Sequence, residues 1–66
     1  MIIYTIVADA IPVEIPYDSW ENIPEEAWNQ IDQIALDTIR EEMRINTWYP
    51  LRHYKNEEDA KDQLGL

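Results

Sequence analysis

The chain has 66 residues and a mass of 7.9 kDa, enough for one small domain over residues 1–66. Its 14 Asp and Glu against 5 Lys and Arg give a formal charge of −9, which repels phosphates and argues against nucleic acid or an anionic bilayer as a direct partner. No cysteine is present, so disulfide bonds and thiolate chemistry are excluded.

The first sixteen residues predict a β-hairpin. Residues 1–8 are rich in β-branched side chains and too short for a buried helix, so they predict a strand. Residues 11–16 alternate between aliphatic and other residues and predict a second strand, after a tight turn at Asp9 and Ala10. Because Pro12 and Pro16 cannot donate to a ladder, this second strand should lie at an edge of the sheet.

Residues 24–44 predict a long amphipathic helix. Pro24 suits the first helical turn, and the two glutamates that follow complement the positive end of the helix dipole. At about 100° per residue, seven side chains share one broad apolar arc: Ala27, Trp28, Ile31, Ile34, Ala35, Ile39 and Met43.

Two acids lie within or beside this apolar arc, namely Asp32 and Glu42. A buried carboxylate is costly unless it is paired. Either both side chains reach solvent from the edge of the arc, or one of them pairs with a residue of the following segment. The candidate partners are Arg52, His53 and Lys55.

The last third of the chain predicts an extended segment and a short helix. Residues 45–55 are aromatic and contain Pro50, and we expect them to run back across the helix and hairpin. One form that this extended segment can take is a third strand interrupted at Pro50. Asn56 is typical of an N-cap before three first-turn acids, and Gly65 suits the C-terminal cap of a helix that ends at Leu64.

Together these elements predict an α+β fold. An N-terminal β-hairpin, with or without the third strand, packs on one long amphipathic helix, and a short C-terminal helix completes the domain. The connector at residues 17–22 is expected to contain a single helical turn that starts at Asp18 or Ser19.

Catalytic and metal-binding patterns are weak. Ser19 and His53 show no spacing that indicates a nucleophile and its base, and 14 acids in 66 residues make carboxylate pairs inevitable. One histidine cannot supply a zinc site alone, and the acids at 57–59 are explained by the start of a helix. A single glycine cannot form a phosphate-binding loop. We therefore expect a non-enzymatic protein without metal or cofactor.

The acidic residues of the long helix suggest a different role. Glu26, Asp37 and Glu41 fall on its predicted solvent face, and the last two are separated by about 6 Å along the axis. Two phosphate steps on one DNA strand cover about 6.8 Å. A row of carboxylates can therefore imitate part of a phosphate track, although an ordinary solvated helix face has the same pattern.

The predicted partner-binding surface combines acids with aromatic anchors. Trp28 lies on the apolar arc and is expected in the core, whereas the other tryptophans lie in connectors, where covering a small core competes with a role in binding. The predicted anionic residues are Glu26, Asp37, Glu41, Glu57, Glu58 and Asp62, and the predicted anchors are Trp20 and Trp48.

In length, composition and helix charge the chain resembles the small acidic proteins that phages encode to block host defences, including anti-CRISPR proteins and other DNA mimics. This resemblance implies an inhibitor that binds the basic nucleic-acid-binding site of a defence complex, such as a CRISPR effector, and excludes DNA. Such a protein would act in the host cytoplasm as a monomer or weak homodimer, without membrane contact; no targeting segment is visible.

The alternative is a small adaptor or subunit of a larger assembly, or a homodimer, that associates through apolar and aromatic surface. The edge of the hairpin at residues 11–15 could then pair with a strand of the partner, within the limit set by Pro12.

Overall fold

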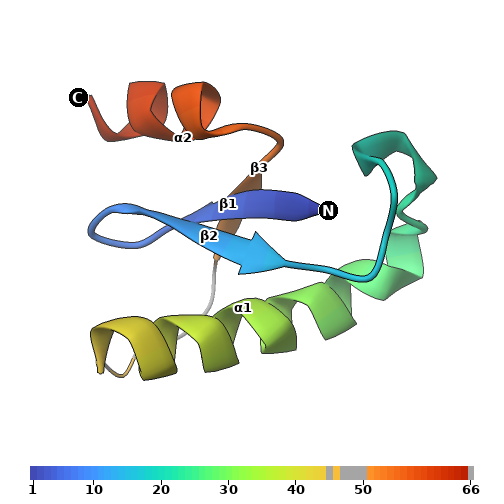
Figure 1. The fold of residues 1–66 in the computed structure, drawn as a ribbon, viewed down its shortest axis with the longest axis horizontal. Coiled ribbons are helices and arrows are strands. Elements are labelled where there is room, and N and C mark those ends of the chain that lie inside the picture. The colour runs from blue at the N-terminus through green and yellow to red at the C-terminus, as the bar shows by residue number, and fades with distance from the viewer. Residues whose placement is uncertain (45, 47–50, 66) are drawn as a thin grey trace.

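Three layers build the fold: a short helix, a three-stranded sheet and a long helix (Figure 1). The computed structural model describes residues 1–44, 46 and 51–65. The elements in chain order are β1 (Ile2–Ile6), β2 (Ala10–Glu14), the single-turn 3-10 helices η1 (Trp20–Asn22) and η2 (Glu25–Ala27), α1 (Trp28–Met43), β3 (Arg52–Tyr54) and α2 (Glu57–Leu64). This arrangement confirms the predicted α+β fold.

The sheet has the strand order β2-β1-β3, and both strand pairs are antiparallel. A third strand is therefore present, but it spans only Arg52–Tyr54 of the predicted segment 45–55. Residues 45 and 47–50, including Pro50, lie outside the described residues. The placement of β3 beside β1 brings the C-terminal third of the chain against the first strand.

The hairpin turn differs from the prediction. Ala10 already pairs with Ile6, so the loop comprises residues 7–9 rather than Asp9 and Ala10. This register places Ile3 opposite Val13, so that both side chains lie on the buried face of the sheet. The Asp9 carboxylate accepts a hydrogen bond of 2.8 Å from the N–H of Ala10, and the N–H of Val7 donates to the Asp9 carbonyl at 3.1 Å within the loop.

Strand β2 lies at an edge of the sheet, as its prolines predict. The N–H of Ile15 donates to the carbonyl of Met1 at 2.9 Å, so odd-numbered residues of β2 direct their backbone groups towards β1. Pro12 and Glu14 direct theirs towards the open edge. Because Pro12 has no N–H, the free edge lacks a donor at its centre.

The core lies between the sheet and α1. Alternate residues of the strands, centred on Ile3 and Val13, face the helix, and Ile31 and Ala35 meet them from α1; all four are fully buried. The opposite side, which we call the outer sheet face, carries the intervening residues and is partly covered by α2 (Figure 1). Its members on the hairpin are Ile2, Tyr4, Ile6, Ala10, Pro12 and Glu14.

Helix α1 is shorter than predicted at both ends. It begins after the 3-10 turn η2, and it ends where Arg44 adopts the left-handed conformation with φ 55°. All seven residues of the predicted apolar arc are buried or half-buried, but the arc omitted Leu36, which is 3% exposed. Leu36 lies one turn after Asp32, which contacts His53 of β3.

Both predicted caps of α2 are confirmed. The Asn56 side chain accepts a hydrogen bond of 2.8 Å from the N–H of Asp59, and Gly65 takes the left-handed conformation with φ 77°. The predicted turn in the connector is also present as η1, and it begins after Ser19. Local sequence signals therefore fix these helix ends.

We expect Asn56→Ala to lower the free energy of unfolding by about 1 kcal/mol, because the first turn of α2 loses its side-chain acceptor. Urea denaturation followed by circular dichroism measures this. The matched control is Gln63→Ala, an exposed position of the same helix that caps nothing. Equal stability of the two variants would show that the cap contributes nothing.

Candidate functional site

The six predicted anionic residues are all exposed, but the fold divides them between two faces. Glu26 belongs to η2, and Asp37 and Glu41 to α1; these three form the α1 acidic face. Glu57, Glu58 and Asp62 belong to α2 and form the α2 acidic face. Because the two helices lie on opposite sides of the sheet, the six residues do not make one continuous surface (Figure 1).

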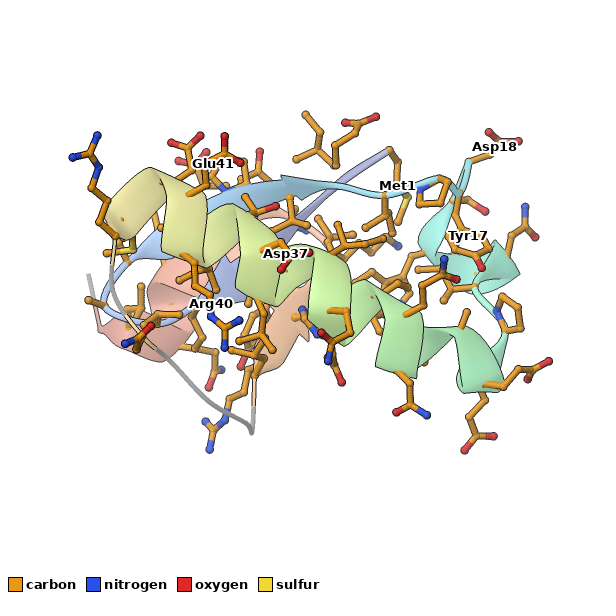
Figure 2. The ribbon with its side chains drawn as sticks, turned by 90° about the horizontal axis from the view of Figure 1, so that it is seen from below. Met1, Tyr17, Asp18, Asp37, Arg40 and Glu41 are labelled. Carbon is orange, nitrogen blue, oxygen red and sulfur yellow. The ribbon has the colours of Figure 1, made fainter. Side chains whose placement is uncertain are left out.

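The α1 acidic face is open to solvent. Figure 2 shows Asp37 on the side of α1 turned away from the sheet, with Glu41 one turn further along. Within the part of the chain that the structure describes, neither carboxylate forms an ion pair. The nearest cation of the helix, Arg40, projects to the opposite side from Glu41 in this view. Asp37 and Glu41 therefore present unneutralised charge.

The α2 acidic face is partly used by the fold. Glu57 forms an ion pair with Lys61 at 2.5 Å, and this contact raises the pKa of Lys61. All three first-turn acids, including Glu58, also complement the positive end of the helix dipole. Asp62 completes the face further along the helix. The charge available to a partner is consequently smaller here than on α1.

The one predicted aromatic anchor within the described residues, Trp20, does not stand free on an acidic face. Trp20 is half-buried against the core, and its ring meets that of Trp28 edge-on, with centroids 5.0 Å apart. Trp28 packs against the core as predicted. Trp48 lies outside the described residues. The described ring of Trp20 therefore covers the core, which is the role that competed with partner binding.

An internal polar network joins β1, β3 and α1. Thr5 and His53 are opposite each other across the strand pair, and the Thr5 Oγ1 lies 2.8 Å from the His53 Nδ1. On the other side of the ring, Nε2 lies 2.5 Å from the Asp32 Oδ1. In the neutral imidazole, Nε2–H donates to Asp32 and Nδ1 accepts from the Thr5 hydroxyl. The ring also stacks on Trp28 at 5.5 Å.

One of the two sequence interpretations of Asp32 is thereby confirmed. Asp32 pairs with His53, whereas Glu42, the second acid near the arc, is exposed. The position of Asp32 on the apolar arc was the signal. Thr5 carried no comparable signal, because a threonine within a β-branched strand is ordinary, and only the pairing of β1 with β3 places it against the histidine.

A hydroxyl, an imidazole and a carboxylate in this order also form a catalytic triad. A triad can act only if a substrate can reach its hydroxyl. Thr5 is 0% exposed, so its hydroxyl cannot reach a substrate from solvent. Ser19 is not among the contacts of His53 in the described residues. The network is therefore a buried connection between sheet and helix.

The described residues contain no group of three or more His, Cys, Asp or Glu side chains that could hold a metal ion. Among their helices, none combines the length and the apolar character needed to cross a membrane.

A further ion pair ties the connector to the end of the sheet. Lys55, directly after β3, donates to Glu21 of η1 at 3.1 Å. A hydrogen bond from the Glu21 backbone, and then this contact with Lys55, lower the pKa of Glu21. The pair is well exposed, so it contributes little to stability.

Comparison with protein-family models, curated proteins and solved structures finds no match to this chain. The case for a function therefore rests on the residues themselves.

Proposed function

We propose that the protein is a non-enzymatic inhibitor that imitates nucleic acid. It binds the basic nucleic-acid-binding site of another protein, of the kind found in a CRISPR effector complex, and excludes DNA from it. The observation that supports this most is the α1 acidic face, where Asp37 and Glu41 stand exposed and without an ion pair among the described residues.

Spacing and total charge support the same proposal. Four residues of helix separate the two carboxylate-bearing positions by about 6 Å along the axis, close to two phosphate steps of about 6.8 Å on one DNA strand. The formal charge of −9 adds a field that accelerates encounter with a cationic surface. Because α2 lies behind the sheet, a partner that grips α1 meets only the α1 acidic face.

Charge reversal tests the proposal. A partner is first captured from host lysate at low salt and identified, and its affinity for duplex DNA is then measured by fluorescence anisotropy. The wild-type protein is expected to displace DNA at close to stoichiometric amounts. We expect Asp37→Lys with Glu41→Lys to weaken this displacement at least tenfold, chiefly through slower association.

The control has the same change in net charge at another place. Asp18→Lys with Glu25→Lys alters two exposed acids, and Asp18 lies at the end of the molecule away from Glu41 (Figure 2). It is expected to weaken displacement no more than threefold. If the two double variants behaved alike, bulk charge rather than the α1 acidic face would be responsible. Unchanged displacement by both would contradict the proposal.

A second candidate function, a subunit that assembles through apolar surface, is favoured by one observation: Ile2 is 50% exposed. Pairing through the β2 edge is less favourable, because Pro12 removes a donor from that edge. Sedimentation at increasing salt separates the candidates. A dimer that tightens with salt supports a subunit, and a monomer at all salt concentrations supports the inhibitor.

A further inference from the structure

The outer sheet face is only partly covered. Helix α2 has eight residues and is about 12 Å long, whereas a five-residue strand spans about 17 Å. Helix α2 packs against β1 and β2 and lies over the end of the sheet nearest the hairpin loop (Figure 1). The opposite end, where β1 begins, is left open.

The open end is apolar with an acidic border. Among the described residues Ile2 is the one large hydrophobic residue classed as exposed, at 50%. Tyr4 follows it on the same face and is half-buried, and its cross-strand neighbour Pro12 is exposed. Directly opposite Ile2 is Glu14, whose side chain is 75% exposed. An apolar contact point thus lies beside an accessible carboxylate.

The charged groups near the open end indicate which kind of partner could bind there. Two cations near this face are engaged: Lys61 pairs with Glu57, and the Met1 ammonium donates to the carbonyls of Ile15 and Tyr17 at 2.9 and 2.8 Å. A third, Arg52, is exposed and lies opposite Ile6, at the end of β1 away from Ile2. The ammonium also forms an ion pair of 3.8 Å with Glu14, whose side chain is nevertheless 75% exposed and accessible to a further cation. In a dimer formed through this face, the α2 acidic faces of the two copies would lie close together. Their repulsion disfavours a second copy of the chain as the occupant.

We propose that the open end of the outer sheet face docks a basic amphipathic helix of the partner. An apolar side chain of that helix contacts Ile2, a lysine or arginine meets Glu14, and the helix lies beside α2, which completes the outer layer. The basic character of the partner rests on the proposed function. The docking face does not, because it lies on the side of the sheet opposite the α1 acidic face.

Two synthetic peptides of 14 residues test this inference. One arranges leucine and lysine so that a helix has an apolar and a basic face, and the other has the same composition in a scrambled, non-amphipathic order. Each is titrated into the ¹⁵N-labelled protein at low salt. The amphipathic peptide is expected to bind at least fivefold more tightly and to shift the amide signals of Ile2, Tyr4 and Glu14.

Two variants locate the contact. Ile2→Ser is expected to weaken binding of the amphipathic peptide at least fivefold and binding of the scrambled peptide less than twofold. Glu14→Lys keeps Ile2 and changes a side chain that is 75% exposed, so it provides a test that does not depend on the packing of Ile2. It is expected to weaken binding of the amphipathic peptide at least threefold. Circular dichroism checks that both variants fold.

The remaining outcomes separate this inference from the proposed function. Shifts confined to Asp37, Glu41 and their neighbours, with binding unaffected by Ile2→Ser, would overturn the docking face and leave the inhibitor proposal standing. Absence of binding by either peptide at low salt would count against both. A dimer in sedimentation that Ile2→Ser dissociates would assign the open end to a second copy and overturn the inference.

Discussion

Replacing Asp32 with alanine is expected to lower the free energy of unfolding by about 2 kcal/mol. The change leaves the Nε2–H of His53 without its acceptor, and the side chain of His53 is only 8% exposed. A domain of this length has a total stability of roughly 3 to 10 kcal/mol. Loss of the contact is therefore expected to lower the midpoint of urea denaturation markedly, with tryptophan fluorescence as the probe.

The control for this prediction is Asp37→Ala, which removes an exposed carboxylate from the same helix. Its effect is expected to stay within about 0.5 kcal/mol. A double-mutant cycle of Asp32→Ala with His53→Ala should give a coupling energy of about 1 to 3 kcal/mol. A coupling near zero would mean that the two side chains do not stabilise each other in solution.

Truncation of Ile31 to alanine is expected to have one of the largest effects of any single core change on α1. Ile31 is fully buried in the cluster with Ile3 and Val13, and deleting three methyl or methylene groups there costs about 3 kcal/mol in transfer and cavity free energy. For a domain of this size that corresponds to a fall of roughly 12 to 24 °C in Tm. Differential scanning calorimetry measures it.

Ile34→Ala provides the comparison, because the same atoms are removed from a half-buried side chain at the edge of the apolar face. A loss of about 1 kcal/mol is expected. If Ile34→Ala destabilised the protein as much as Ile31→Ala, the core would extend further around α1 than the structure places it.

Elements defined by local chemistry could be predicted from the sequence. Asn56 and Gly65 mark the ends of α2 through their own side chain and backbone, and Pro12 assigns β2 to the edge without reference to other segments. The features that differed depend on tertiary contacts. The hairpin loop gained a residue because Ile3 and Val13 must share a face, and Asp32 finds its partner His53 only because the chain returns along β3.

The candidate sites show the same division. Exposure of Asp37 and Glu41 follows from the helical repeat of α1, and the pairing of Asp32 could be suggested from its place on the apolar arc. No periodicity, however, indicates on which side of the sheet a second helix will pack. The separation of the two acidic faces and the open end beside Ile2 therefore emerge only in three dimensions.

The missing donor at the centre of the β2 edge has a consequence for the behaviour of the protein at high concentration. Growth of cross-β fibrils requires each added strand to find an unbroken row of backbone partners, and Pro12 interrupts that row. Pro12→Thr restores the N–H and suits a strand, so it is expected to promote thioflavin-positive aggregates. A single imino acid is thus expected to help keep an isoleucine-rich protein dispersed.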